Sequence, residues 1–240
     1  MRFQSPLMPA RLLRRYKRFL ADAVLEESGK EVVAHCPNPG AMLGLAQPGA
    51  RIWLEPNDDP KKKLKFGWRL EELQDGYMAG IDTSVPNKVV SEALNAGQIL
   101  EAGPIESVKA EVPYGTNSRV DFLCQSDDGK DVYVEVKNVH LRRDGDWAEF
   151  PDCITTRGAK HLHELIEVVS QGHRAIMLYL IQRDDCARFR LAPDLDPKYA
   201  KAFDRARAAG VEMIAYGTQI TRDVITLGTS IPVDPRDQAQ

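Results

Sequence analysis

The chain has 240 residues, with 32 Lys and Arg against 35 Asp and Glu, so its formal net charge is −3 at pH 7. Hydrophobic residues make up 43% and charged residues 28%, which is typical of a soluble globular protein and unlike a disordered or fibrous one. No run approaches the roughly 20 apolar residues that span a bilayer, and the arginine-rich start of the chain lacks the apolar core of a signal peptide. We therefore expect a cytoplasmic protein with no membrane contact.

The four cysteines, at positions 36, 124, 153 and 186, lie far apart. They form no CxxC pair, and no histidine stands at the spacing of a zinc site. We expect reduced thiols, as in most cytoplasmic proteins, rather than a disulfide framework or a zinc finger.

The charge is distributed unevenly along the chain. Residues 1–69 contain 13 Lys and Arg against 7 Asp and Glu, a net charge of +6, whereas residues 70–240 have a net charge of −9. A basic front half favours a polyanionic partner, and an acidic rear half is compatible with a metal-binding cluster. Two domains whose charges merely interact with solvent would give the same distribution, so charge alone decides nothing.

Short β segments separated by turns fill the first 83 residues. The candidate strands are residues 18–24, 31–35, 50–54, 65–72 and 76–81, the last two forming a hairpin. Several short strands at this spacing indicate a small barrel, and an OB-like β-barrel is the natural candidate because it offers a nucleic-acid-binding face. The boundary is expected near residues 82–86, which gives an OB-like domain of residues 1–83 and a second domain of residues 84–240.

Helices and strands alternate in the second domain. Helices are expected from Asn87, as N-cap, to a stop at Gly97, and over residues 156–171 and 197–209. Strands are expected at residues 118–125 and 131–139, which form a hairpin, and at the apolar runs 175–181 and 211–216. This order predicts a mixed α/β fold in which helices cover both faces of a sheet.

The expected hairpin carries the charged residues of greatest chemical interest. With a three-residue loop centred on Asp128, Asp121 lies opposite Glu135, and Arg119 lies opposite Lys137. A two-residue loop would shift this register by one position. The other face of the hairpin is uniformly apolar, with valines at positions 120, 132, 134 and 136, a phenylalanine at 122 and a cysteine at 124.

Two carboxylates that face each other across a strand pair repel, at a cost of some tenths of a kcal/mol. A divalent cation such as Mg²⁺ or Mn²⁺ would offset the repulsion, because hard cations prefer carboxylate oxygens. Asp121 and Glu135 around a metal ion, with the Lys137 ammonium beside it, is a known arrangement for phosphodiester hydrolysis. The alternative is that these residues form the solvated side of an amphipathic hairpin, and spacing alone does not exclude it.

Several motifs resemble the sugar fermentation stimulation protein (SfsA) family. They are Ser118-Arg119-Val120-Asp121-Phe122, the run from Tyr133 to Val139, Phe150-Pro151-Asp152 leading into Thr156–Leu162, and the segment His35-Cys36-Pro37-Asn38-Pro39-Gly40. The resemblance spans residues of about 10 to 228. Val120 stands where the superfamily name PD-(D/E)xK has Pro, and Pro39 stands where Thr is expected.

The resemblance implies an N-terminal OB-like β-barrel followed by a PD-(D/E)xK nuclease-like α/β domain. It also implies DNA binding and a role in regulating sugar (maltose) utilisation genes. Carried over by position, Asp121 and Glu135 are the metal ligands and Lys137 is the catalytic lysine. The superfamily often adds an acidic residue from the preceding helix, for which Glu92 is the candidate, although an ordinary exposed glutamate would give the same pattern.

Candidate DNA contacts fall into two basic clusters and a few residues near the hairpin. They are Arg14, Arg15, Lys17, Arg18, Lys61, Lys62, Lys63, Arg119, Arg157 and Lys160. Clusters of this density neutralise several phosphates, and the affinity then falls steeply with salt. Arg157, Lys160 and His161 are expected opposite the apolar face of their helix. A metal site made of His161 and His163 is not favoured, because side chains at i and i+2 diverge.

Two functions from different classes follow. The first is a DNA-binding regulator of weak sequence specificity, in which the nuclease-type fold supplies shape and a divalent-metal site. The second is an active Mg²⁺-dependent nuclease that hydrolyses phosphodiester bonds. The complete set of Asp121, Glu135 and Lys137 favours the enzyme, whereas the resemblance favours the regulator. The resemblance decides between them, so the regulator is the function predicted from the sequence and the nuclease is the alternative.

Overall fold

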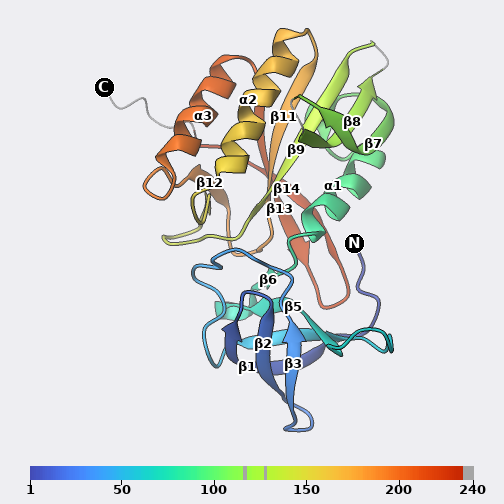
Figure 1. The fold of residues 1–240 in the computed structure, drawn as a ribbon, viewed down its shortest axis with the longest axis vertical. Coiled ribbons are helices and arrows are strands. Elements are labelled where there is room, and N and C mark those ends of the chain that lie inside the picture. The colour runs from blue at the N-terminus through green and yellow to red at the C-terminus, as the bar shows by residue number, and fades with distance from the viewer. Residues whose placement is uncertain (116–117, 127–128, 235–240) are drawn as a thin grey trace.

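The computed structural model describes residues 1–115, 118–126 and 129–234, which form a β-barrel and an α/β domain, the lower and upper parts of Figure 1. The barrel consists of β1 (Met8–Tyr16), β2 (Leu20–Leu25), β3 (Glu31–His35), β4 (Arg51–Pro56), β5 (Phe66–Glu72) and the short β6 (Met78–Gly80). The strand order is β3-β2-β1-β4-β5, and a parallel pairing of β3 with β5 closes the barrel. The OB-like barrel predicted from the sequence is confirmed.

Alternating burial builds the barrel interior. On β1, β4 and β5 the side chains of Leu12, Ile52, Leu54 and Trp68 are fully buried and pack together. The indole of Trp68 also donates a hydrogen bond to the carbonyl of Leu70, at 3.0 Å, so its buried N–H is satisfied.

The strand β1 is absent from the elements expected above. Its register with β2 shifts between Leu12 and Arg14, so the alternation of apolar and polar residues breaks in the middle of the strand. The expected strand at residues 18–24 starts at Leu20 instead, because Lys17 and Arg18 have positive φ angles of 49° and 64° and form the turn.

The α/β domain is built on a six-stranded sheet of order β14-β13-β11-β9-β8-β7. Its strands are β7 (Ile105–Tyr114), β8 (Ser118–Ser126), β9 (Asp131–Val139), β11 (Arg174–Ile181), β13 (Glu212–Ile220) and β14 (Ile225–Ile231). The pair β10 (Trp147–Phe150) and β12 (Arg188–Leu191) forms a small separate parallel sheet. The helices are α1 (Val85–Asn95), α2 (Thr156–Ser170) and α3 (Pro197–Ala208). Two 3₁₀ turns lie at Gln74–Gly76 and Leu100–Ala102.

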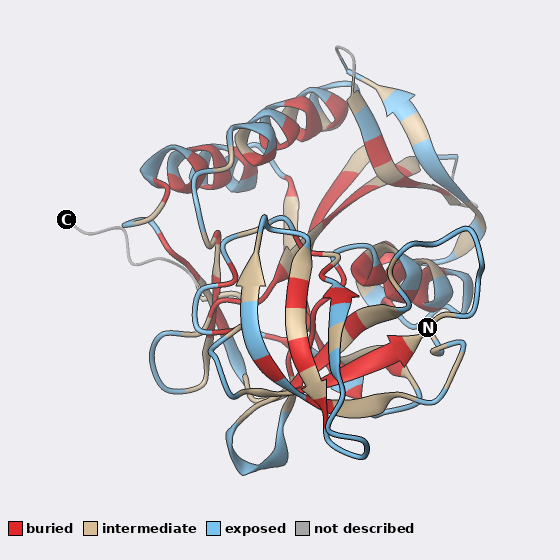
Figure 2. Cartoon of the chain, turned by 60° about the horizontal axis from the view of Figure 1, so that its bottom comes forward, coloured by how far each residue is buried: buried red, intermediate tan, exposed pale blue. Residues whose placement is uncertain are grey.

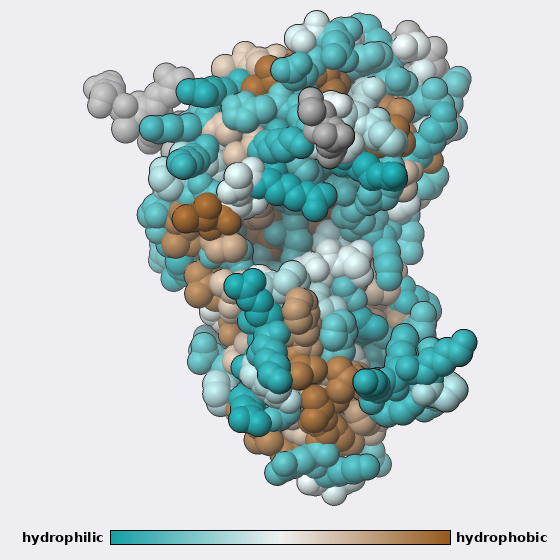
Figure 3. All heavy atoms as spheres, in the orientation of Figure 1, coloured by the Kyte–Doolittle hydropathy of each residue, from teal (hydrophilic) through white to brown (hydrophobic). Residues whose placement is uncertain are grey.

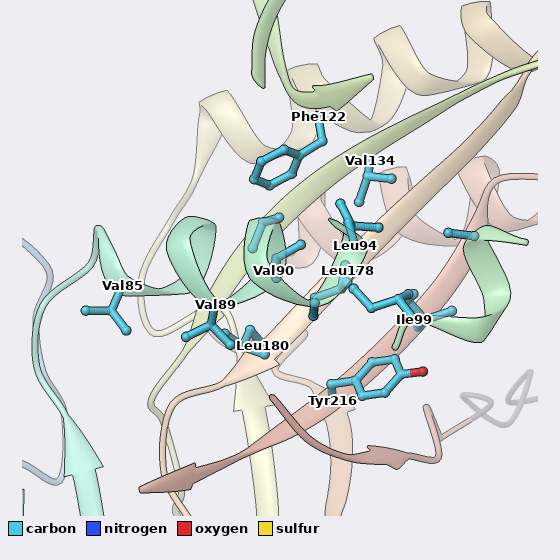
Figure 4. Close-up of a cluster of buried hydrophobic side chains, with 14 of the residues drawn as sticks. Val85, Val89, Val90, Leu94, Ile99, Phe122, Val134, Leu178, Leu180 and Tyr216 are labelled. Atoms are coloured by element: carbon cyan, nitrogen blue, oxygen red, sulfur yellow. The ribbon is translucent and has the colours of Figure 1, made fainter. Parts of the chain in front are cut away.

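Helices cover both faces of this sheet, as the sequence predicts. Val89, Val90 and Leu94 of α1 pack on one face, against the valines and leucines of β9 and β11 (Figure 4). On the other face α2 and α3 pack against Met177 and Tyr179 of β11. Figure 2 shows the consequence, because the helices are buried along one side and exposed along the other. Among the described residues, no helix is long and apolar enough to cross a membrane.

The start of α1 differs from the expectation. Helix α1 begins at Val85 with Pro86 in its first turn and Ser84 as N-cap, so the prediction of Asn87 as N-cap is wrong. Proline is favoured in the first helical turn because its missing N–H has no partner there in any case. Asn87 therefore lies inside the helix, where its side chain is free to reach β8.

The two domains share buried contacts. Trp53 and Leu70 of the barrel pack into the hydrophobic cluster beneath α1, and Arg2 forms a β-bridge with Val224 of the α/β domain. His140, just after β9, is buried and bonds through Nε2 to the carbonyl of Gly80. These contacts connect the barrel to the domain that carries the hairpin.

Burial shifts the pKa values of two titratable groups near this interface in opposite directions. Burial lowers the pKa of His140 to about 4, because the cationic ring is disfavoured there. Burial raises the pKa of Glu71 to about 7, although the backbone N–H of Ala46 partly offsets the shift. The buried His140 is therefore neutral at neutral pH, and Glu71 is close to half protonated.

Single variants at these positions should separate the two contributions. Glu71 stabilises the fold below pH 4.5 and loses that contribution as pH rises through 7, so the stability of wild type relative to Glu71→Gln should fall by about 3 kcal/mol across this window.

His140 costs stability below its unfolded pKa of about 6.5, so the stability of wild type relative to His140→Asn should rise by about 3 kcal/mol between pH 4 and 6.5. Urea unfolding at a series of pH values measures both. Parallel stability curves for wild type and variants would contradict the assignments.

Candidate functional site

The hairpin of β8 and β9 has the register that places its charged residues together. Phe122 pairs with Val134, and Leu123 pairs with Tyr133, as expected from a three-residue loop. The paired residues end one position short of Asp121 and Glu135, and the same register brings these two residues to neighbouring places on the two strands. The expected loop centre, Asp128, lies outside the described residues. The apolar face of the hairpin is buried beneath α1, as predicted.

Asp121 is held from two elements. Its Oδ1 accepts a hydrogen bond from Asn87 Nδ2 of α1, and its Oδ2 accepts one from the backbone N–H of Val136 on β9, both at 2.7 Å. Burial raises the pKa of Asp121, and the nearby Glu135 carboxylate raises it further, against the effects of Val136, Lys137 and Asn87. The side chain is oriented, but its negative charge is incompletely compensated.

Glu135 is almost completely buried, with 2% of its surface exposed. Its Oε1 accepts hydrogen bonds from Lys137 Nζ, at 2.6 Å, and from His161 Nδ1. Burial raises the pKa of Glu135, but the bonds from His161 and Lys137 outweigh burial and hold the pKa below its usual value. Its Oε2 is buried and has no hydrogen-bond partner among the described residues. The site therefore contains a charged carboxylate with one vacant acceptor atom.

Helix α2 supplies a contact to Glu135 that differs from the expectation. His161 is 4% exposed and faces the sheet, so the expectation that it lies opposite the apolar face of its helix is wrong. Its Nε2 accepts a hydrogen bond from Arg157 Nε at 3.2 Å, which makes Nδ1 the nitrogen that donates to Glu135. The hydrogen-bonded chain Arg157, His161, Glu135 and Lys137 joins α2 to β9. The sequence signal for this contact is the spacing of Arg157 and His161, which stand four residues apart and therefore lie on the same side of the helix.

Two further polar atoms near these carboxylates are buried without a partner among the described residues: the Tyr114 hydroxyl and Glu164 Oε2. Burial raises the pKa of Tyr114, and the charges of Glu135, Glu164 and Asp121 raise it further. All three carboxylates therefore disfavour the ionised form of the Tyr114 hydroxyl. Neither Tyr114 nor Glu164 was expected from the sequence, because each resembles an ordinary strand or helix residue.

The donor set fits a hydrated hard cation. Asp121 and Glu135 offer two carboxylates, and Glu135 Oε2 is an unused acceptor. Both nitrogens of His161 are already engaged. In the part of the chain that the structure describes, no group of three or more His, Cys, Asp or Glu side chains is placed to hold a metal ion. A cation here would keep several water ligands, as Mg²⁺ normally does.

Glu92 lies apart from this chain of hydrogen bonds. Its exposed carboxylate accepts a hydrogen bond from the amino group of Met1 at 2.6 Å. Glu92 and Asp121 nevertheless line the same cavity of about 380 Å³ next to α1. The structure therefore places Glu92 on the α1 side of Asp121, without a contact to Glu135.

The basic residues near the hairpin have intramolecular partners. Lys160 donates to Ser118 Oγ at 3.0 Å and pairs with Glu164 at 3.4 Å. Arg119 donates to the carbonyl of Glu111 at 3.0 Å and remains exposed. Arg157, in contrast, is linked to Glu135 through His161.

The basic residues of the barrel differ in accessibility. Arg14 is exposed and pairs with Asp22 at 2.8 Å, whereas Arg15 donates to the carbonyls of Arg18, Asn38 and Gly40 and so supports the loop structure. Lys17 and Arg18 are exposed in the β1–β2 turn, next to Phe19, which is 49% exposed.

The second basic cluster lies between β4 and β5. Lys61, Lys62 and Lys63 are exposed there, and Lys62 and Lys63 line a cavity of about 520 Å³. The tryptophans Trp53 and Trp68 are buried, so they are not available for stacking on bases.

Comparisons with known proteins agree with the two-domain architecture. A family model described as "SfsA N-terminal OB domain" matches residues 13–81, and one described as "Sugar fermentation stimulation protein RE domain" matches residues 84–224. The matched ranges agree with the β-barrel and the α/β domain of the structure, and with the two-domain fold that the family resemblance implies.

Individual relatives match along the whole chain. A sugar fermentation stimulation protein homolog of Dinoroseobacter shibae is 70% identical over 239 residues, covering 100% of this chain and 98% of the relative. One of a Jannaschia species is 64% identical over 241 residues, with complete coverage of both chains. The structure of Pyrococcus furiosus SfsA in complex with Ca²⁺ aligns with a TM-score of 0.84 at 27% identity, over 98% of this chain and 100% of the other. The chain therefore belongs to the sugar fermentation stimulation protein family.

Proposed function

We propose that this protein binds DNA and hydrolyses its phosphodiester bonds with a divalent ion, Mg²⁺ or Mn²⁺, held by Asp121 and Glu135. The observation that carries the proposal is the buried, charged Glu135 carboxylate, whose Oε2 has no partner among the described residues. A buried charge with a vacant acceptor is costly unless a cation or donor meets it. The relative from Pyrococcus furiosus was solved in complex with Ca²⁺, which supports a divalent site in the family.

The surrounding residues would then have distinct roles. When bound, the ion would polarise the phosphoryl group and lower the pKa of a coordinated water. Asn87 and the Val136 N–H orient Asp121, while His161 orients Glu135. The Lys137 ammonium, 2.6 Å from Glu135 Oε1, would stabilise negative charge that develops on the phosphate.

The exposed basic residues of the barrel would bind the DNA backbone. The clusters at Lys17 and Arg18 and at Lys61, Lys62 and Lys63 contact phosphates rather than bases in this proposal, so sequence specificity would be weak. We place the protein in the cytoplasm, with the domain boundary between residues 83 and 84.

A second candidate is a DNA-binding regulator without turnover. The names of the relatives refer to sugar fermentation, which supports a role in the expression of sugar (maltose) utilisation genes. In this case the metal site would act as a phosphate clamp. Binding without cleavage separates this candidate from the nuclease.

Lys137→Ala should abolish most of the cleavage while leaving DNA retention intact. Removing one charged group that stabilises the transition state typically costs a factor of about 10²–10³. Labelled single- and double-stranded DNA incubated with Mg²⁺, Mn²⁺ or EDTA measures cleavage and retention together. The matched control is Lys201→Ala on the exposed surface of α3. If wild type retains DNA but never cleaves it, the nuclease proposal fails and the regulator stands.

Metal affinity should depend on the two carboxylates of the hairpin. Asp121→Asn and Glu135→Gln should each lower the affinity for Mn²⁺ at least tenfold, because each removes one of two anionic ligands. Glu92→Gln should have less effect, since Glu92 is exposed and bonded to Met1. Titration calorimetry on the folded variants gives these affinities. Equal Mn²⁺ affinity for wild type and Asp121→Asn would remove the hairpin as the metal site.

Charge reversal of Lys61, Lys62 and Lys63 to Glu should weaken DNA binding strongly and flatten its salt dependence. For every phosphate that the variant no longer neutralises, the slope of log affinity against log salt should decrease by about 0.7–0.9. Fluorescence anisotropy between low and moderate salt measures the slope, and the exposed Lys198, changed to Glu, is the control. An unchanged slope would move the DNA interface away from this loop.

A further inference from the structure

A polar pocket of about 240 Å³ lies between the two domains and has no part in the function proposed above. Figure 3 shows the molecular surface hollowed between the barrel and the α/β domain. The pocket is lined from the barrel by the Asn38–Gly40 loop, from the linker by Thr83, and from the α/β domain by Asn138, His140, Glu149, Phe150 and Asp152. Pockets for drug-sized ligands usually measure about 300–1,000 Å³, so this one suits a single small ring system.

The pocket adjoins the candidate metal site. Asn138 follows Lys137 directly on β9, and the ring of Phe150 packs 5.5 Å from that of Tyr179, the residue that pairs with Lys137 in the sheet. Through Asn138, the lining of the pocket is therefore one residue away from Lys137 along β9.

The polar groups of the pocket are pre-organised. Asn38 donates to the carbonyl of Ile81 at 3.1 Å and accepts from the backbone N–H of Gly40 at 2.9 Å. The neutral His140 donates a hydrogen bond from Nε2 to the carbonyl of Gly80. Its Nδ1 is therefore an acceptor, and it accepts a hydrogen bond from Asn138 Nδ2 at 3.1 Å. These bonds engage both nitrogens of His140 and hold the two amides in place, while the half-buried ring of Phe150 offers a stacking surface.

Gly40 keeps the pocket open. A methyl group at this position would lie 3.0 Å from Asn38 Oδ1 and 3.3 Å from Asp152 Oδ2, and would occupy the space between the two domains. The missing side chain at Gly40 thus leaves room beside the Asp152 carboxylate.

We propose that this pocket binds one unpaired nucleobase of single-stranded DNA, next to the phosphate at Lys137. The inference rests on the proposed function and narrows its substrate to DNA with an unpaired nucleotide, because a paired base must first be unpaired and unstacked, whereas an unpaired base avoids that cost. The Asp152 carboxylate accepts hydrogen bonds and donates none, so it favours bases that carry an exocyclic amino group over thymine.

The test compares oligonucleotides of one length in EDTA, so that cleavage plays no part. Wild type should bind a deoxycytidine oligonucleotide about tenfold more tightly than a wholly abasic one, because the abasic strand has no base to stack or to hydrogen-bond in the pocket. Gly40→Ala should weaken binding of the deoxycytidine oligonucleotide and leave the abasic oligonucleotide and a blunt duplex within twofold of wild type. Fluorescence anisotropy measures all three.

If Gly40→Ala keeps the wild-type preference for the deoxycytidine oligonucleotide over the abasic one, the pocket does not bind the base. If Gly40→Ala unfolds, Asp152→Asn replaces it, and its preference for deoxycytidine over thymidine oligonucleotides should shrink severalfold. If Gly40→Ala binds all three DNA ligands as wild type does and the protein still cleaves DNA, the pocket proposal is rejected and the proposed function stands. Failure of wild type to bind any DNA rejects the proposed function and the pocket together.

Discussion

Two like charges held together on neighbouring strands constrain much of this structure. The register of β8 and β9 places Asp121 beside Glu135, and burial of both carboxylates makes their repulsion costly. The surrounding elements each contribute a compensating group: Asn87 from α1, the Val136 N–H and Lys137 from β9, and His161 from α2. The helices on the two faces of the sheet are thereby connected to one another through these side chains.

The compensation is uneven, and this asymmetry supports the proposed metal site over a structural ion pair. Both oxygens of Asp121 and one of Glu135 are hydrogen-bonded, whereas Glu135 Oε2 is buried without a partner among the described residues. Native proteins rarely leave a buried acceptor unsatisfied without a functional reason. A solvated outer face, the alternative that spacing left open, is incompatible with a Glu135 that is 2% exposed.

Local pattern predicted the elements that are long or strongly periodic, and tertiary contacts decided the rest. The hairpin register, both layers of helices and the buried strand β11 follow from apolar spacing. The strand β1 was missed because its register shift after Leu12 interrupts the alternation. His161 was assigned to the wrong side of α2 because a polar residue on a buried face is visible in the sequence only if its partner, Glu135, is known to lie opposite.

Under the proposed function, the arrangement of the two domains would let one chain combine weak DNA binding with a defined cleavage position. The basic loops of the barrel would attract the DNA backbone without reading bases, since phosphates carry no sequence information. The buried contacts through Trp53, Leu70 and His140 hold the barrel against the sheet that carries Lys137. A strand bound along the barrel would therefore meet the hairpin at a set distance, so the domain interface would select the phosphate that reaches Lys137.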